Sequence, residues 1–239
     1  MTASDVLSGV RAQLAQVSAL GPAGERAPVA PTIVVVAAGL AIGVGAWLVA
    51  AGFLAIGVAP AIAGIAAITA GILFGAAVVE RGVASAFDRW LGARWSSSAT
   101  AGAVLLRVVA LWSTAPSAWW AALIVPAGFG RLAAVALQRL GDVGPPPLGR
   151  SFVIKKVGAI ELVIAIAVVA IVTVAFAGGL GFALLGAGAV VAIVLGLALE
   201  VGEGELAADS LAVSAAAIEL VAAVGLAAIA PALRSPFIG

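Results

Sequence analysis

The chain has 239 residues, of which 64% are hydrophobic and 10% are charged, and its mean hydropathy is +1.27. A soluble domain carries about 25% charged residues, so this composition predicts an integral membrane protein in contact with a lipid bilayer. Cysteine, histidine and tyrosine are absent, which excludes disulfides, thiol nucleophiles, imidazole bases and metal sites built from Cys or His. The net charge of +1 gives no indication of a nucleic-acid partner.

Residues 1–27 differ from the rest of the chain because they mix charged and moderately apolar residues. Asp5 and Arg11 interrupt this segment, which lacks the basic start, apolar core and cleavage site of a signal peptide. We expect a cytoplasmic tail or a short amphipathic helix on the membrane surface, and the sequence leaves both open. Residues 28–239 then form a single transmembrane helical domain.

Long uncharged segments divide this domain into membrane spans. A helix needs about 20 apolar residues to cross a bilayer. By length and lack of charge we expect seven spans, at about residues 31–56, 60–79, 100–115, 118–138, 157–177, 180–199 and 211–231. The predicted fold class is therefore all-α, a polytopic integral membrane bundle of about seven transmembrane helices.

Three polar loops, 80–98, 139–156 and 200–210, alternate with nearly uncharged turns. The basic residues on the side of these loops are Arg11, Arg26, Arg81, Arg89, Arg94, Arg139, Arg150, Lys155 and Lys156. Because basic loops stay in the cytoplasm, we expect a multi-pass protein of the inner (cytoplasmic) membrane with a cytoplasmic N-terminus. Three polar loops on one face favour an enzyme, since transporters more often place polar groups near the midplane.

Four charged residues fall inside the predicted spans: Arg107, Arg131, Glu161 and Glu219. A central charge costs at least about 2.5 to 3.5 kcal/mol on insertion scales, so we expect these groups to pair inside the bundle. We predict that Glu219 pairs with Arg107 or Arg131. Arg131 and Glu161 are also near enough to the cytoplasmic interface to extend toward it. Such pairs either fix helix register or mark a functional site, and the sequence leaves both open.

The first polar loop carries the most informative pattern. Directly after the second span the sequence reads ERGVASAFDR, with carboxylates at Glu80 and Asp88. This resembles the acidic motif D-G-x-A-D-x-x-D-G of the cobalamin synthase family, adenosylcobinamide-GDP ribazoletransferase, which also follows a second span. The matching positions, with one residue inserted, are Glu80, Gly82, Ala84 and Asp88. Ser85 stands in place of the second aspartate, and Arg89 replaces the final glycine.

The resemblance continues in the same order over about residues 28–232. Arg94 begins a stretch similar to the family's R-D-S motif, and Gly130-Arg131 is similar to the S/G-R start of a later span. GEGELAADSLAVSAAAIEL is similar to the closing G-G-x-T-G-D-x-L-G-A-A-x-E-L. The matching acids, Asp209 and Glu219, are ten residues apart rather than seven, which places them about 80° apart around a helix.

The resemblance implies a Mg²⁺-dependent enzyme of late cobalamin biosynthesis. Such an enzyme transfers the cobinamide phosphate of a GDP-activated donor to α-ribazole and releases GMP, so its partners are corrinoid and nucleotide small molecules. The resemblance implies that Glu80 and Asp88 hold the metal and that these two and Asp209 are catalytic. The implied phosphate-binding residues are Arg94, Arg131, Arg150, Lys155 and Lys156. We expect the three loops to form one concave polar surface with Glu80 and Asp88 near its floor.

Two other functions stay open on the residues alone. The chain is also consistent with a non-catalytic relative that acts as a membrane scaffold or partner subunit, because the acidic motif is incomplete. In that case we expect Arg81 or Arg89 to form a salt bridge with Glu80 or Asp88 where the metal would bind. A small-solute transporter is the third reading, and a polar cavity that reaches the midplane would favour it. A homo- or hetero-oligomer also stays open.

Overall fold

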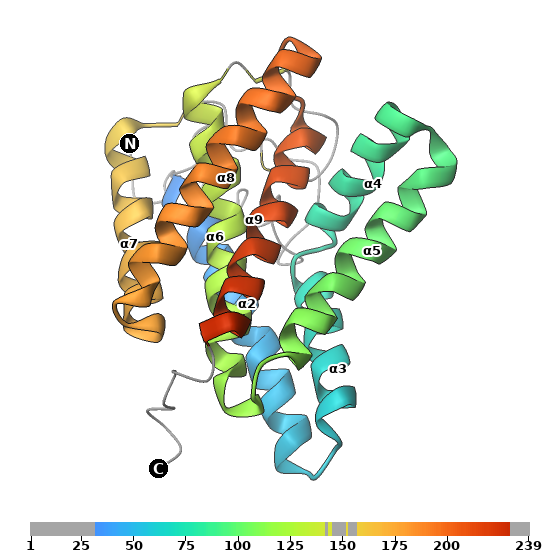
Figure 1. The fold of residues 1–239 in the computed structure, drawn as a ribbon, viewed down its shortest axis with the longest axis vertical. Helices are drawn as coiled ribbons and strands as arrows, with labels where there is room; N and C mark the ends of the chain where they lie inside the picture. Colours follow the sequence, from blue (N-terminus) through green and yellow to red (C-terminus); the bar gives the residue numbers. More distant parts are fainter. Residues whose placement is uncertain (1–31, 142, 145–151, 153–156, 230–239) are drawn as a thin grey trace, which may run out of the picture.

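The computed structural model describes residues 32–141, 143, 144, 152 and 157–229, and this part of the chain is helical (Figure 1). Its elements are α2 (Thr32–Ala55), α3 (Pro60–Phe74), α4 (Val78–Leu91), α5 (Ala93–Trp112), the 3₁₀ turn η1 (Pro116–Ala118), α6 (Trp119–Leu140), α7 (Ala159–Ala177), α8 (Leu180–Glu203) and α9 (Ala208–Ile229). No strand occurs among these residues, so the predicted all-α class is confirmed. Segment 1–27, Arg150, Lys155 and Lys156 lie outside the described residues.

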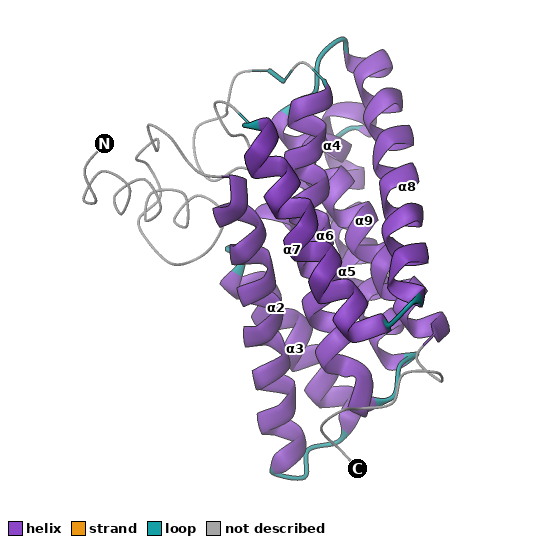
Figure 2. Ribbon diagram, turned by 90° about the vertical axis from the view of Figure 1, so that its left-hand side faces the viewer, coloured by secondary structure: helices purple, strands orange, loops and turns teal. Residues whose placement is uncertain are grey.

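Five helices, α2, α6, α7, α8 and α9, are long and apolar enough to cross a membrane. The central one is α6, because 89% of its most apolar stretch is buried inside the bundle, against 17% for α7. α7 runs along the outside of the bundle (Figure 2), where it exposes aliphatic side chains such as Ile171. A membrane helix that contacts lipid is expected to expose aliphatic side chains in this way. The described part of the chain therefore forms a helical membrane bundle.

Small residues bring α2 and α6 close together. A Cβ atom added at Gly43 would lie 2.6 Å from the Cα atom of Ile124, so the two backbones touch at this level. Close approach of this kind is how membrane helices gain packing energy, since lipid tails remove the hydrophobic driving force between them. The contact fixes the position of α6, which carries Arg131 further along the same helix.

The segment 80–98, predicted to be a loop, is instead a helical hairpin made of α4 and the start of α5. Only Gly92 separates the two helices, and its φ of 90° provides the turn. α4 is amphipathic, with buried residues at helical spacing: Val79, Val83 and Ala86. The polar residues that favoured a loop occupy the other sides of this helix, so the error came from reading polarity as irregular backbone.

The predicted second span, 60–79, is broken between α3 and α4, which are bent by 81° relative to each other. Ala76 and Ala77 both have φ of 52°, in the left-handed region that costs an L-residue about 1 to 2 kcal/mol. Nη2 and Nε of Arg81 donate hydrogen bonds to their carbonyl oxygens at 2.9 and 3.3 Å, respectively. The Ala77 carbonyl oxygen also accepts from the backbone nitrogen of Arg81 at the start of α4, so the Arg81 side chain mainly supplies a partner for the Ala76 carbonyl beside it.

The number of spans differs from the seven predicted. The described residues hold five candidate spans, or six if the bent α3–α4 pair counts as one. The predicted span 100–115 lies mostly within α5, which is not among these candidates. α5 begins with ARWSSS and carries Arg107, so its composition is less apolar than that of the other long helices.

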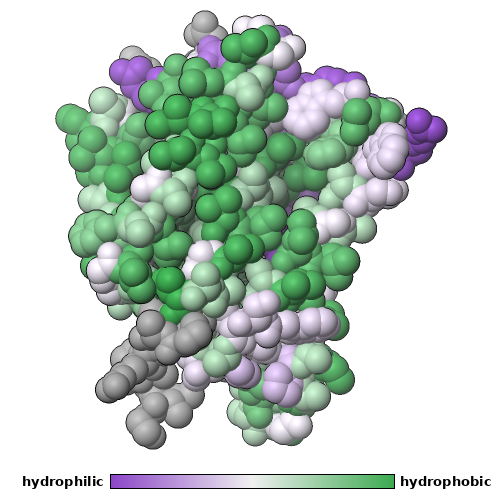
Figure 3. Space-filling view, in the orientation of Figure 1, coloured by the Kyte–Doolittle hydropathy of each residue, from purple (hydrophilic) through white to green (hydrophobic). Residues whose placement is uncertain are grey.

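The polar connections gather at one end of the bundle. The α4–α5 turn, the end of α6, the start of α7 and the α8–α9 turn all lie toward the top of Figure 1. The turns after α2, α5 and α7 lie at the other end. Hydrophilic residues are concentrated along the same upper edge in Figure 3. The α4–α5 and α8–α9 polar regions and the described ends of segment 139–156 therefore lie at one end of the molecule, in agreement with the predicted alternation of charged and uncharged segments.

Candidate functional site

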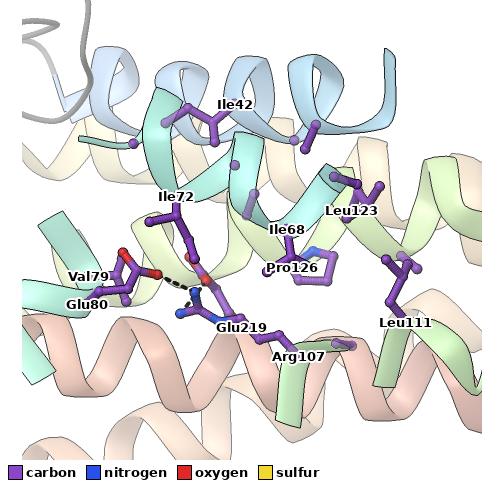
Figure 4. Close-up of a pocket in the computed structure, with 18 of the residues that line it drawn as sticks. Ile42, Ile68, Ile72, Val79, Glu80, Arg107, Leu111, Leu123, Pro126 and Glu219 are labelled. Atoms are coloured by element: carbon purple, nitrogen blue, oxygen red, sulfur yellow. Dashed lines mark hydrogen bonds and ion pairs between the residues drawn. The ribbon is translucent and has the colours of Figure 1, made fainter. Parts of the chain in front are cut away.

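Four charged side chains from four helices meet inside the bundle, and we call them the charge quartet: Glu80 of α4, Arg107 of α5, Arg131 of α6 and Glu219 of α9. Nη1 of Arg107 donates to Oε1 of Glu80 at 2.6 Å. Nη2 of Arg107 lies 2.9 Å from Oε2 of Glu219, and Nη1 of Arg131 donates to Oε1 of the same carboxylate. Glu219 is thus held between two guanidinium groups, and Figure 4 shows the one from Arg107 between Glu80 and Glu219.

The charge quartet is buried and its formal charges sum to zero. Arg131 is 5% exposed and Glu219 is 6% exposed, while the side chains of Arg107 and Glu80 are each 12% exposed. Arg131 and Glu219 lie near the middle of α6 and α9, where an unpaired charge would be expensive in a membrane. The predicted pairing of Glu219 with Arg107 or Arg131 is present, and it involves both arginines.

Gly130 makes room for the carboxylate of Glu219. A Cβ atom at this position would lie 2.5 Å from Cγ of Glu219 and 2.8 Å from the carbonyl oxygen of Ala215. α6 therefore passes directly against α9 beside the carboxylate, and Arg131 follows Gly130 in the sequence. The Gly-Arg pair serves two purposes here, since the glycine admits Glu219 and the arginine binds it.

Glu161 does not take part in the charge quartet, contrary to the predicted pairing of two arginines with Glu161 and Glu219. Its Oε2 accepts a hydrogen bond from the backbone nitrogen of Thr32 at 3.1 Å. Thr32 is the first residue of α2, so this carboxylate satisfies one of the free amide groups at a helix N-terminus. Glu80 takes its place, and sequence reasoning missed this role because Glu80 was assigned to a surface loop.

A second group of polar side chains lies between α4 and the α8–α9 turn, and we call it the polar-end cluster: Ser85, Arg89, Glu203, Asp209 and Ser210. Nη2 of Arg89 lies 2.7 Å from Oε1 of Glu203 and 3.0 Å from Oδ1 of Asp209. The hydroxyl of Ser85 donates to Asp209 at 3.0 Å, and that of Ser210 donates to Glu203 at 2.6 Å. Arg89 thus bridges two carboxylates from two helices.

Glu203 was missed as a site residue by the sequence reasoning. Its two carboxylate oxygens accept hydrogen bonds from Arg89, Ser210 and the indole nitrogen of Trp90, the last at 2.7 Å. The sequence offered only its place in an acidic turn, which is typical of a solvated loop. Its role depends on α4 lying beside the α8–α9 turn, and no local pattern indicates that contact.

The expected magnesium ligands do not form a common site. Glu80 and Asp88 are eight residues apart on one helix, which separates them by about 12 Å along its axis and about 80° around it. Mg²⁺ binds its oxygen ligands at about 2.0 to 2.1 Å, so these two carboxylates cannot share an ion. Asp88 is exposed, and Asp209 faces Arg89. Within residues 32–141, 143, 144, 152 and 157–229, no three acidic side chains are grouped so as to hold a metal.

The residues implied in phosphate binding are also not brought together where they can be located. Arg94 is exposed at the start of α5, with its guanidinium 5.8 Å from the centre of the Trp95 ring. Arg131 lies on a different helix, α6, and belongs to the buried charge quartet. The expected salt bridges of Arg81 or Arg89 with Glu80 or Asp88 are wrong in detail, since Arg107 binds Glu80 and Arg89 binds Asp209.

A cavity of about 80 Å³ adjoins the charge quartet (Figure 4). The quartet lines it together with apolar residues of α2, α3, α5 and α6, among them Ile42, Ile68, Leu111 and Leu123. In Figure 4 the charged groups lie toward one end of the cavity, while Leu111 and Leu123 lie toward the other.

Comparison of the chain with protein-family models, curated proteins and solved structures gave no match.

Proposed function

We propose that the chain is a membrane protein of the cobalamin synthase type that lacks metal-dependent transferase activity and acts as a scaffold or partner subunit. One observation carries this proposal: arginine side chains occupy the carboxylates that the resemblance assigns to chemistry on α4 and α9. Arg107 binds Glu80, and Arg89 binds Asp209. Asp88 is the exception: it is exposed on α4, and within the described part of the chain no arginine forms a salt bridge with it.

The physical reason is competition for the carboxylate oxygens. A guanidinium and a magnesium ion both bind carboxylate through its oxygen lone pairs, and Mg²⁺ also demands near-octahedral geometry. The arginine is covalently part of the chain, so its local concentration is fixed and high. Transfer to a phosphoanhydride depends on neutralising phosphate charge with a bound cation, and a carboxylate already neutralised by arginine contributes little to holding one.

The test is an assay of purified protein for GMP release from adenosylcobinamide-GDP with α-ribazole and Mg²⁺. We expect release at the rate of a protein-free control. A matched variant, Ser85→Asp with Arg89→Gly, restores two letters of the family motif and shows whether the assay conditions permit activity on this scaffold. Mg²⁺-dependent release by the unmodified protein, abolished in Asp88→Asn, would show that the chain is an active transferase.

We further propose that the polar end of the bundle is cytoplasmic, in the inner membrane of the cell, with a cytoplasmic N-terminus. The support is the concentration of basic residues at that end. The chain contains no cysteine, so single cysteines at the exposed positions Ser97 and Ser117 report cleanly on topology. An impermeant thiol reagent applied to intact cells should label Ser117→Cys and spare Ser97→Cys. Equal labelling of both would contradict the arrangement.

A second candidate function, a small-solute transporter, is favoured by the cavity beside the charge quartet. This cavity adjoins Arg131 and Glu219, which lie near the middle of their helices, and transporters place their binding sites at that depth. The check is the swelling rate of proteoliposomes in urea or glycerol. Swelling faster than that of protein-free vesicles supports transport, and an equal rate rejects it for these solutes.

A further inference from the structure

The turn between α4 and α5 carries large apolar side chains at the polar end of the bundle, and we call Trp90, Leu91, Arg94 and Trp95 the hairpin tip. Trp90, Leu91 and Trp95 are 36%, 56% and 47% exposed, respectively. Exposed apolar side chains that gather in one place mark a surface that contacts a partner or a membrane. The resemblance uses only Arg94 of this group, for a substrate phosphate, and the proposed function uses none of it.

The two exposed tryptophans of α5 are spaced like the two faces of a bilayer. Trp95 lies near the start of α5 and Trp112 is its last residue, and they are 47% and 46% exposed. The 17 residues from one to the other correspond to about 26 Å along a helix axis, close to the roughly 30 Å of the hydrocarbon core. Because tryptophan is enriched at both membrane–water interfaces, this spacing fits one tryptophan at each interface.

The rest of the bundle gives the level of the membrane at the polar end. α7 is a candidate span that begins at Ala159, and Ile160 in its first turn is 78% exposed. In Figure 1 the α4–α5 turn lies near the level of the start of α7. Further along α5, Leu105 and Val109 are exposed aliphatic residues of the kind that contact lipid. The hairpin tip therefore lies where the apolar surface of the bundle ends.

Arg94 is the cation of the hairpin tip that remains available to a ligand. Arg89 also lies over an indole ring, but its guanidinium is bound to Glu203 and Asp209. Arg94 is exposed, and within the described part of the chain no carboxylate forms a salt bridge with it. Its guanidinium lies 5.8 Å from the centre of the Trp95 ring. A guanidinium binds phosphate through paired N–H donors, and phosphate is the anion of the bilayer surface.

We propose that the hairpin tip binds the headgroup layer of the bilayer. Trp90, Leu91 and Trp95 lie in the interfacial layer, and the Arg94 guanidinium binds the phosphate of a phospholipid. The exposed carboxylate of Asp88 balances Arg94, so the tip has no excess of positive charge. The ligand is therefore a single phosphate group rather than a negatively charged membrane surface, and phosphatidylcholine, which has no net charge, is sufficient.

The depth of the tip is measured with a nitroxide on Leu91→Cys in phosphatidylcholine vesicles, from its collision rates with oxygen and with a water-soluble nickel chelate. The chain contains no other cysteine, and Leu91 is exposed, so the label should not disturb folding. We expect the nitroxide at the level of the lipid phosphates or up to about 10 Å below it. Ile171→Cys on α7 and Glu205→Cys in the α8–α9 turn carry the same label as references for hydrocarbon and water.

The phosphate contact is measured with a fluorophore on Leu91→Cys, quenched in detergent by phosphatidylcholine that carries a nitroxide on its headgroup. Adding Arg94→Gln should raise the lipid concentration for half-quenching about fivefold, the usual contribution of one basic residue near a lipid surface. Arg139→Gln is the matched control, since Arg139 is exposed at the end of α6 at the same end of the bundle, and it should leave this concentration unchanged. A nitroxide-labelled diacylglycerol, which lacks the phosphate, should quench both variants equally.

Three results would overturn the proposal. A Leu91 nitroxide as exposed to the nickel chelate as the Glu205 reference would place the tip in water, and one as deep as the Ile171 reference would place it in hydrocarbon. An equal half-quenching concentration in Arg94→Gln and Arg139→Gln would show that Arg94 does not bind the lipid phosphate. Relief of the quenching by millimolar inorganic phosphate would show that a soluble phosphate is the ligand.

Discussion

The charge quartet and the polar-end cluster both join arginines to carboxylates, and α4 and α9 contribute residues to both. In each, α4 and α9 contribute residues to a network in which an arginine bridges two carboxylates. They differ in the burial of the bridging arginine: the Arg107 side chain is 12% exposed and that of Arg89 is 41% exposed, whereas the carboxylates of Glu203 and Asp209, at 15% and 16%, are nearly as buried as that of Glu80 at 12%. The two networks therefore place the same kind of interaction, an arginine between two carboxylates, in two environments within a single protein.

Burial decides what such a network contributes to stability. An exposed ion pair is worth about 0 to 1 kcal/mol, because water solvates the separated charges nearly as well. Removing one partner of a buried pair costs about 3 to 5 kcal/mol, because the remaining charge is left without compensation. The comparison teaches that the buried network has the larger structural role, although the polar-end cluster contains more hydrogen bonds from hydroxyl and indole groups.

The largest effect is expected for Glu219→Ala, which leaves Arg107 and Arg131 without their shared carboxylate. We expect a loss of about 3 to 5 kcal/mol in the free energy of unfolding, measured by denaturant titration in detergent. Asp209→Ala is the matched control, since it removes a carboxylate from the same helix whose arginine partner, Arg89, is 41% exposed. A loss below about 1 kcal/mol in Glu219→Ala, equal to that of an exposed pair, would mean that burial does not separate the two networks.

The next effect is expected for Gly130→Ala, which keeps every charge but crowds Glu219. The added Cβ would lie 2.5 Å from Cγ of Glu219, and overpacking of this kind costs about 1 to 3 kcal/mol. Gly102→Ala on α5 is the control, because no atom lies within 4 Å of its added Cβ. Equal unfolding free energies for the two variants would show that α6 and α9 are less closely packed at this level.

A smaller effect is expected for Arg89→Gln in the polar-end cluster. The cost should be about 0 to 1 kcal/mol at low salt and should shrink as salt rises from about 0.1 M to 1 M, over which the Debye length falls from about 10 to 3 Å. The cost of Arg107→Gln, measured in the same unfolding titrations, should stay nearly constant over that range. A salt-independent cost for Arg89→Gln would place this network in the buried class.

An effect of similar size and opposite sign is expected at the α3–α4 break, which leads into the helix that carries Glu80. Ala77 has φ of 52°, a conformation that glycine adopts without steric cost. Ala77→Gly should stabilise the protein by about 0.5 to 1 kcal/mol, the relief of strain being partly offset by the greater freedom of the unfolded chain. Destabilisation in the same titration would show that the methyl group of Ala77 packs against the bundle.

Periodicity and composition were reliable for the long apolar helices and unreliable for the amphipathic ones. α6 to α9 were predicted within a few residues, because apolar length alone defines a span. α4 was missed because Glu80, Arg81, Asp88 and Arg89 look like loop residues when counted by polarity. Their spacing around Val79 and Val83 fits a helix that buries only one side.

One ion pair of the candidate site could be predicted from the sequence, and the other could not. The pairing of Glu219 with an arginine was predicted from the free-energy cost of placing an unpaired charge inside a membrane span. That prediction does not require knowing how the helices pack. The choice of Glu80 rather than Glu161 as the second carboxylate could not be predicted. It requires α4 to follow the bend at Ala76 and Ala77 and to lie beside α5 and α9, and that arrangement joins residues far apart in the chain.

The sequence by itself determined that this is an all-α membrane protein, that its polar segments share one end, and that Glu219 pairs with an arginine inside the bundle. These properties follow from the free-energy cost of exposing polar groups to lipid. That cost depends on the composition of each segment and not on which helices pack together. Only the tertiary structure decided which residues pair, that arginines neutralise the carboxylates of α4 and α9, and that a small cavity adjoins them. These depend on helix contacts set by small residues such as Gly43 and Gly130, and a one-dimensional pattern does not encode which helices touch.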